Sequence, residues 1–265
     1  MIYAKSEKDL EKMRAVGELI AGVREALRGM VTPGISTMEL NNAAEKMMRD
    51  AGAIPTFIGY HGFPYAICAS VNHEIVHGFS KTDPLKEGDI CSLDMAATYQ
   101  GFVGDTAITV PVGAIADDLK QLIRVTEECL EQGIEQCWPG NRVGDIGWAV
   151  EQHASEYGYG IVRDYTGHGI GRQMHEAPQI PNYGRKGTRD KIRAGYCFAI
   201  EPMLNMGSAE TRTLSDGWTV VTRDGLPSAH FEHTLAVTAD GPEVLTLTRE
   251  QKEQRKARAA ANVVP

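Results

Sequence analysis

Apolar side chains recur at every third or fourth position in the first part of the chain, which is the repeat of an amphipathic helix. The pattern covers residues 6–30 and is carried by Leu10, Met13, Val16, Ile20, Val23 and Leu27. Ser6, with Asp9 three residues on, can cap the start of this helix. The turn-forming stretch Thr32-Pro33-Gly34 ends it.

A second helix is predicted directly afterwards, capped by Ser36 or Thr37 and reaching Ala51-Gly52. The same order of elements returns about 106 residues further along, with one helix near 117–135, a stop at Trp138-Pro139-Gly140 and another helix behind it. Four pairs of landmarks keep this offset to within one residue: Pro33 and Pro139, His61-Gly62 and His168-Gly169, Gly88 and Gly195, Asp94 and Glu201.

This internal repeat predicts one α+β domain over residues 1–265, with similar halves at about 1–115 and 116–250. A charged tail over 250–265 would follow as a solvated helix with a frayed end. Two independent domains are the alternative, but no stretch rich in Pro, Ser or Gly lies near residue 115 to link them.

Two apolar runs that each contain an acidic residue predict a β-hairpin. Residues 90–97 and 102–110 have the composition of strands, with a turn centred on Tyr99 and Gln100. In that register Asp94 faces Asp105 directly, at roughly 5 Å, where like charges repel. A bound divalent cation would relieve this repulsion in a mostly buried setting.

Glu201 and Glu232 interrupt apolar strand-like runs in the second half in the same way. A salt bridge or a backbone cap explains one such buried acid equally well, but four acids on a two-fold repeat favour a common site. His168 lies among glycines in Gly167-His168-Gly169, which allows a ligand to approach closely. Four carboxylates and one imidazole suit manganese, iron, cobalt or catalytic zinc, and they balance the charge of two divalent ions.

These five residues, in this order and context, closely resemble the ligand set of type I methionine aminopeptidases. The resemblance runs from Ser6 to about Leu247 and is most specific over residues 59–64, 166–171 and 200–203. It implies the pita-bread fold, in which two pseudo-two-fold halves share an antiparallel sheet covered by helices. It also implies removal of the N-terminal methionine from nascent proteins, with a preference for a small second residue. By this resemblance Asp94 binds one metal ion, His168 and Glu201 bind the other, and Asp105 and Glu232 bridge the two.

The resemblance further implies the roles of three residues in the reaction. Glu201 acts as general base while the bridging hydroxide of the dinuclear site attacks the scissile carbonyl. His175 stabilises the resulting oxyanion, and His77 contacts the peptide after the scissile bond.

The methionine side chain would lie in an apolar pocket, for which sulfur and aromatic groups are suited. By the resemblance this pocket consists of Tyr60, Phe63, Cys68, Met174 and Trp218, with Phe57 and His61 nearby. Phe57, Phe63 and Met174 depart from the Cys, Tyr and Phe that are common at these positions. The departures keep the pocket apolar but change its shape.

The remaining histidines have no expected catalytic part. His153 lies on the apolar face of a predicted helix, where a satisfied core histidine is the better interpretation. His73, His230 and His233 are close to the candidate ligands in sequence only.

Composition and charge limit the classes of binding partner and the cellular locations that we expect for this protein. The net charge of −8 argues against a general nucleic-acid binder. The polar N-terminus shows no signal peptide, and no run reaches the roughly 20 apolar residues of a membrane helix. Five cysteines without a CxxC pair indicate free thiols in a reducing compartment, so we expect a cytoplasmic location. We expect a monomer because the sequence shows no obvious extra segment. A contact of the charged tail with the ribosome is conceivable, but nothing in the sequence supports it.

Three other functions are compatible with parts of this pattern. X-Pro aminopeptidases and prolidases commonly carry a large N-terminal domain, whereas this chain has few residues before its first helix. A type II methionine aminopeptidase would need a helical insertion between His175 and Glu232. A non-catalytic peptide- or RNA-binding relative would have lost its ligands, and all five are present here.

Overall fold

A computed structural model of the chain describes residues 2–261. Its α-helices are α1 (Glu7–Met30), α2 (Thr37–Asp50), α3 (Asp117–Ile134), α4 (Val143–Glu156) and α5 (Arg249–Ala261). The predicted caps are confirmed for α1, where Ser6 and Asp9 form a capping box, and for α2, where Ser36 is the capping residue. The repeated helix pair of the second half is confirmed by α3 and α4.

The strands are β1 (Ile54–Pro55), β2 (Ile67–Val71), β3 (Glu74–Val76), β4 (Ile90–Tyr99), β5 (Phe102–Pro111), β6 (Gly160–Ile161), β7 (Gly167–Gly169), β8 (Glu176–Ile180), β9 (Cys197–Ile200), β10 (Met203–Asn205), β11 (Thr211–Thr213), β12 (Val220–Thr222), β13 (Ser228–His230), β14 (Glu232–Thr238) and β15 (Gly241–Val244). A 9-stranded antiparallel sheet has the order β1-β4-β5-β14-β9-β7-β8, with β2 beside β4 and β15 beside β14. Two three-stranded sheets, β13-β10-β6 and β11-β12-β3, complete the fold.

The large sheet takes strands from both halves of the repeat, and its centre is the line where β5 meets β14. On one side of this line β4 continues the sheet, and on the other side β9 does so. The order agrees with a pseudo-two-fold arrangement, because the strand that carries Asp94 and the strand that leads into Glu201 lie at matching distances from the centre.

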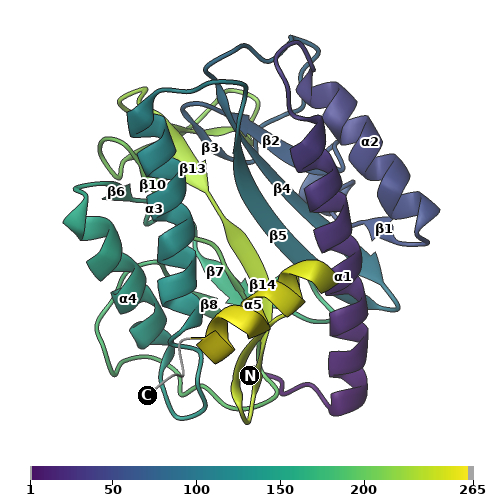
Figure 1. Cartoon of the computed structure of the whole chain (residues 1–265), viewed down its shortest axis with the longest axis vertical. Helices are drawn as coiled ribbons and strands as arrows, with labels where there is room; N and C mark the ends of the chain where they lie inside the picture. Colours follow the sequence, from purple (N-terminus) through teal and green to yellow (C-terminus); the bar gives the residue numbers. More distant parts are fainter. Residues whose placement is uncertain (1, 262–265) are drawn as a thin grey trace.

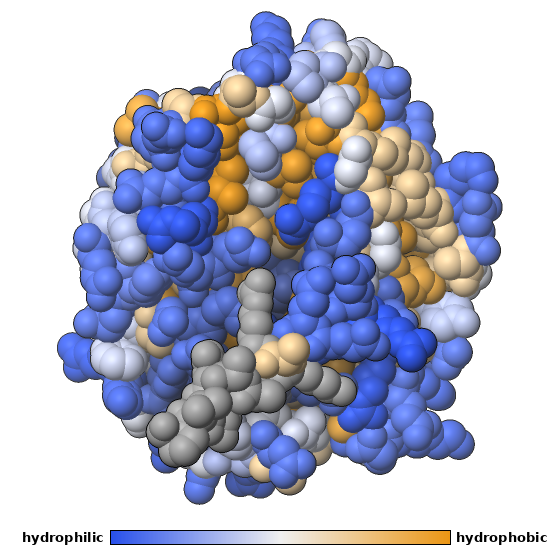
Figure 2. Space-filling view, viewed as in Figure 1, coloured by the Kyte–Doolittle hydropathy of each residue, from blue (hydrophilic) through white to orange (hydrophobic). Residues whose placement is uncertain are grey.

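Helices α1, α3 and α5 lie across one face of this sheet (Figure 1). The apolar stripe of α1 is fully buried there, with Met13, Val16 and Ile20 at 0 % exposure. Gly17 lets the helix approach closely, because a Cβ at this position would lie 2.6 Å from the carbonyl oxygen of Leu245. The outer surfaces of the helices are mostly hydrophilic, while apolar side chains show in the gap between α1 and α3 (Figure 2).

The predicted hairpin is present, but its predicted register is wrong. Tyr99 pairs with Phe102, so the turn is Gln100-Gly101, and both of these residues have positive φ (51° and 77°). Such a two-residue turn matches the twist of the strands. Asp94 therefore pairs with Ala107, and Asp105 pairs with Ala96. The shift is by two residues, so the two acids remain on one face as diagonal neighbours rather than direct partners.

The charged tail was expected to be a solvated helix, but the first turns of α5 contact other helices. Arg255 in α5 contacts Glu131 in α3 at 2.7 Å, and Lys252 contacts Glu18 in α1 at 3.2 Å. The predicted frayed end of the tail includes residues 262–265, which lie outside the described residues. None of the helices among residues 2–261 is long and apolar enough to cross a membrane.

Candidate metal and substrate site

A cavity of about 250 Å³ opens on the face of the sheet that points away from α1. Thr106 contacts α1 through Arg24, and successive strand residues point to opposite faces, so Asp105 points into the cavity. The lining contains every residue that the sequence assigned to the site: Asp94, Asp105, His168, Glu201, Glu232, His77, His175, Phe57, Tyr60, His61, Phe63, Cys68, Met174 and Trp218. Tyr165 and Thr166 also line it and were not anticipated.

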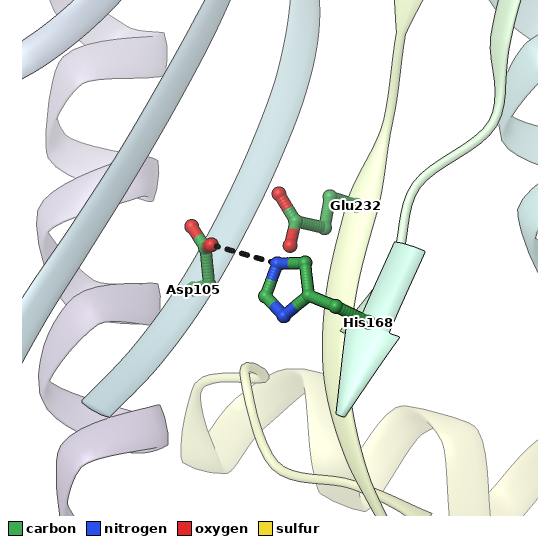
Figure 3. A group of neighbouring side chains, drawn as sticks. All are labelled: Asp105, His168 and Glu232. Carbon is green, nitrogen blue, oxygen red and sulfur yellow. Dashed lines mark ion pairs between the residues drawn. The ribbon is translucent and has the colours of Figure 1, made fainter. Parts of the chain in front are cut away.

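The five candidate ligands come together from five separate stretches of chain. Asp105 in β5, His168 in β7 and Glu232 in β14 offer ligand atoms that all lie within 4.8 Å of one another. Figure 3 shows the carboxylates of Asp105 and Glu232 beside the same edge of the His168 imidazole. His168 Nε2 is 3.9 Å from Asp105 Oδ2 and 3.7 Å from Glu201 Oε1.

Burial shifts the pKa values of this cluster strongly. It raises the pKa of Asp94 to about 7. It also raises the pKa values of Asp105, Glu201 and Glu232 well above their usual range, and the negative charges of neighbouring acids add to the effect. Burial lowers the pKa of His168 to about 3. The ring is therefore neutral at neutral pH, and its short contacts with carboxylates are not ion pairs.

A hydrogen bond orients the His168 ring. Its Nδ1 lies 2.9 Å from the backbone oxygen of Gly169, which can only accept, so the ring proton is on Nδ1. Nε2 is left with a free lone pair that faces the carboxylates. This orientation is the usual one for a metal-binding histidine.

Divalent cations fit this cluster. Asp94 Oδ1, Asp105 Oδ1 and Glu232 Oε1 are buried without a hydrogen-bond partner, which is costly for charged oxygens. No Lys or Arg side chain lines the cavity among the described residues to neutralise them. Oxygen ligands together with one imidazole form a donor set for a catalytic divalent metal.

Two further histidines lie at the open side of the cluster. The Tyr60 hydroxyl is 2.6 Å from His175 Nδ1, and the His175 ring lies 4.3 Å from the His168 ring, centroid to centroid. Burial lowers the pKa of His77 to about 4 and also lowers the pKa of His175. Both rings are therefore neutral at neutral pH, and each can donate one hydrogen bond and accept another.

Aromatic and sulfur-containing side chains form the rest of the cavity wall. Phe63 makes edge-on contacts with Trp218 at 5.1 Å and Phe57 at 6.3 Å between ring centroids. Met174 and Cys68 are 6 % and 4 % exposed beside them. Burial raises the pKa of the Cys68 thiol, which therefore stays protonated and apolar. The wall can enclose an unbranched apolar side chain.

The two unanticipated lining residues directly precede the Gly167-His168-Gly169 stretch. Tyr165 packs edge-on against His77, with the ring centroids 5.5 Å apart. Their proximity to His168 in sequence was the signal that could have identified them.

Threonine hydroxyls hold the two carboxylate-bearing strands β5 and β14 together. The backbone pairing of these strands covers only Glu232 with Ala107 and His233 with Thr106. Beyond it, the Thr234 hydroxyl accepts from the backbone N–H of Asp105 at 3.0 Å and donates to the Asp105 oxygen at 2.8 Å. At the other end, the Thr109 hydroxyl makes the same two bonds with the backbone of His230, at 2.8 and 2.9 Å. We call this junction the β5–β14 seam.

A buried arginine supports the seam from the opposite face. Arg24 is 1 % exposed and donates to the Thr106 hydroxyl at 2.7 Å and to the Thr246 backbone oxygen at 3.0 Å. The Thr106 hydroxyl in turn donates to the backbone oxygen of Glu232 at 2.9 Å. Asp105 and Glu232 thus extend from a backbone that is fixed on both faces.

The histidines without an expected role lie as follows. His233 contacts Thr246 at 2.8 Å, on the face away from the cavity, and His73 is exposed. His153 is partly buried and contacts Glu128 at 2.9 Å. His230 is buried, and neither ring nitrogen has a partner. None of them lines the cavity.

Comparisons with known proteins agree with this geometry. Residues 11–239 match metallopeptidase family M24. A methionine aminopeptidase from Clostridium perfringens is 46 % identical over 249 residues, which span 94 % of this chain and 100 % of the relative. The crystal structure of methionine aminopeptidase from Rickettsia prowazekii superposes with a TM-score of 0.92 at 45 % identity, covering 93 % of this chain and 100 % of that one. A prolidase from Pyrococcus horikoshii, at 22 % identity and a TM-score of 0.74, shares the fold.

Proposed function

The chain belongs to metallopeptidase family M24, and we propose on this basis that it acts as a methionine aminopeptidase. It is a hydrolase that removes the N-terminal methionine of peptides in a metal-dependent reaction. The observation that carries this function is a single cavity in which a buried carboxylate–imidazole cluster borders an apolar wall of Met174, Cys68 and aromatic rings.

The protein binds divalent metal, and we propose two ions per chain. Asp94 would hold one ion, His168 and Glu201 the other, and Asp105 and Glu232 would bridge them. The support is the count of four acids in the cavity, two buried (Asp105 and Glu232) and two partly buried (Asp94 and Glu201), which balance two divalent charges, and the three buried oxygens without partners. When bound, such ions polarise a carbonyl and supply a nucleophilic hydroxide at neutral pH. Mn, Fe, Co and Zn all suit these ligands.

We propose that three side chains of the cavity act on the substrate. Glu201 takes up the proton released during attack on the scissile carbonyl. If the Tyr60 hydroxyl donates to Nδ1 of His175, the ring proton lies on Nε2, from which the ring can donate to the oxyanion. His77, packed between Tyr165 and Trp218, contacts the peptide beyond the scissile bond.

The apolar wall would bind the methionine side chain, with Tyr60, His61 and Phe57 at its edge. Phe57 and Phe63 make this wall aromatic, and the thioether of Met174 adapts to the shape of the ligand. A small second residue is the preference we propose, in common with the family that the sequence resembles.

The natural substrates we propose are nascent proteins that begin with methionine. Residues 1–265 would act as one catalytic domain, since one sheet contains strands from both halves. We propose a cytoplasmic location, supported by five buried free cysteines, and a monomeric state. A ribosome contact through the charged tail remains a hypothesis without structural support.

Hydrolysis by chelator-stripped protein tests the function. Met-Ala-Ser, Met-Lys-Ser and Ala-Pro-Ser are offered with and without added Mn²⁺, Fe²⁺ or Co²⁺. We expect metal-dependent release of methionine from Met-Ala-Ser and little from Met-Lys-Ser. Cleavage of Ala-Pro-Ser alone would instead indicate X-Pro specificity, and inactivity on all three with every metal would refute the enzymatic function.

A further inference from the structure

The short segment before α1 is joined to the loop that carries Met174 and His175 of the cavity wall. Lys5 Nζ donates to Glu176 Oε2 at 2.7 Å, and the two side chains are only 7 % and 14 % exposed. The Lys5 backbone N–H donates to the oxygen of Gly195 at 2.7 Å, which fixes the segment against the second half of the chain. This ion pair therefore joins residues that are 171 positions apart.

Glu176 uses its other oxygen to close the loop that carries Met174 and His175. Its Oε1 accepts from the backbone N–H of Arg172 at 2.8 Å and from that of Gln173 at 3.3 Å. A carboxylate that is bound on both oxygens, by an ammonium group and by backbone amides, makes strong charge-assisted hydrogen bonds. We call Lys5, Glu176 and these two amides the loop clamp.

The clamp leaves no room for a side chain at the start of the loop. A Cβ at Gly171 would lie 2.5 Å from Lys5 Cε and 2.7 Å from Glu176 Oε1. Glycine at 171 therefore lets the ammonium group and the carboxylate meet directly beneath the backbone of the loop.

Two further contacts hold the outer side of this loop: Arg172 pairs with Asp9 at 3.4 Å, and the backbone N–H of Val103 donates to the Gly171 oxygen at 2.8 Å. A hollow of about 590 Å³ lies there, lined by Lys5, Arg172, His175 and Glu176 among others. Arg172 itself is 65 % exposed at its side chain. On the inner side, Met174 packs into the cavity wall and His175 contacts Tyr60 at 2.6 Å. The clamp is therefore one of several contacts that fix the backbone of this loop, and it is the one that binds the amides of Arg172 and Gln173, directly before Met174 and His175.

We propose that Lys5 and Glu176 are positioning residues, which hold the 171–176 loop so that His175 and Met174 meet the substrate in productive geometry. This inference rests on the proposed function. Neither residue lines the cavity that contains the candidate ligands, so both act through the loop. Errors of about 1 Å in the position of a catalytic group can cost roughly 100-fold in rate.

Lys5→Met tests the clamp, because it keeps the length of the side chain and removes the charge. Lys5→Arg is the rescue variant. Arg14→Met is the matched control, since it breaks the α1 ion pair of Arg14 with Glu243 at 2.9 Å, and neither partner lines the cavity. We expect Lys5→Met to accelerate amide hydrogen exchange at residues 172–176. We also expect it to lower kcat on Met-Ala-Ser by about 10- to 100-fold, with a smaller change in KM.

Two further measurements separate positioning from a general loss of structure. Mn²⁺ affinity, measured by calorimetry, should stay within about twofold in Lys5→Met, and Lys5→Arg should recover most of the rate. Glu176→Gln, which keeps an acceptor for the two amides, should show an intermediate loss. Unchanged exchange and unchanged kcat in Lys5→Met, or an equal loss of rate in Arg14→Met, would overturn the proposal. If the wild-type protein cleaves no methionyl peptide, the proposed function fails, while the exchange measurement still tests the clamp.

Discussion

The β5–β14 seam provides a sharp test of how the fold holds its carboxylates. Thr234 is fully buried, and its hydroxyl is the partner of both the backbone N–H and the backbone oxygen of Asp105. Thr234→Val replaces this hydroxyl with a methyl group of similar size. The shape of the core is preserved, and only the two hydrogen bonds are lost.

The structure sets the size of the expected effect. Asp105 is 2 % exposed, so no water can replace the missing partner of its N–H or its oxygen. Each buried polar group left unpaired costs about 1–3 kcal/mol, so for the two groups we expect a loss of about 2–6 kcal/mol in the free energy of unfolding. Because Asp105 also changes position, metal affinity should fall by roughly 10- to 100-fold, as is usual when a residue behind a ligand is replaced.

Urea unfolding of the metal-free protein and calorimetric titration with Mn²⁺ measure these two quantities. Thr234→Ser is the control, because it keeps the hydroxyl and removes one methyl group, at a cost of about 1 kcal/mol. The reasoning is refuted if Thr234→Val loses less than about 0.5 kcal/mol, which is within the range of neutral substitutions. It is also refuted if Thr234→Ser is as damaging as Thr234→Val.

Further predictions concern the candidate ligands and their charges. Asp94→Ala should lose metal and activity together, so full activity at full metal content would contradict its assignment as a ligand. His175→Ala should bind metal normally and lose turnover by about 100-fold or more, the usual scale for an oxyanion donor; a normal rate would remove it from the reaction. Glu232→Ala should weaken both metal ions at once in a titration, and loss of one ion alone would argue against a bridge. In the metal-free protein, the raised pKa values of Asp105, Glu201 and Glu232 mean that the folded state binds more protons than the unfolded state. Stability should therefore fall as pH rises from about 7.5 to about 8.5, where unfolded histidines with a pKa of about 6.5 are already mostly neutral. Urea unfolding across this range should show the fall, and saturating Mn²⁺ should reduce it. The part that remains is expected from the five buried cysteines, whose raised pKa values keep them protonated in the folded state while unfolded thiols begin to ionise.

Local patterns in the sequence were sufficient for the helices, and together with the family resemblance they pointed to residues that line one cavity. The capping residues Ser6 and Ser36 act within one turn, so their signals can be read without knowledge of the fold. The repeat placed Asp94 and Glu201 at matching positions, and both line the same cavity. Whether each residue performs the role implied by the resemblance stays a prediction, because the structure shows only where the residues lie.

The tertiary structure decided the features that depend on distant segments. It also decided one local feature, the turn of the β4–β5 hairpin: Gln100 and Gly101 both take positive φ, and the register lies two residues from the one expected. The threonine bonds of the seam and the pairing of Lys5 with Glu176 join residues more than 100 positions apart. No pattern of spacing along the chain predicts these contacts. The physical reason is that caps and amphipathic periods depend on neighbouring residues, whereas these contacts depend on which distant surfaces pack together and leave polar groups to be paired.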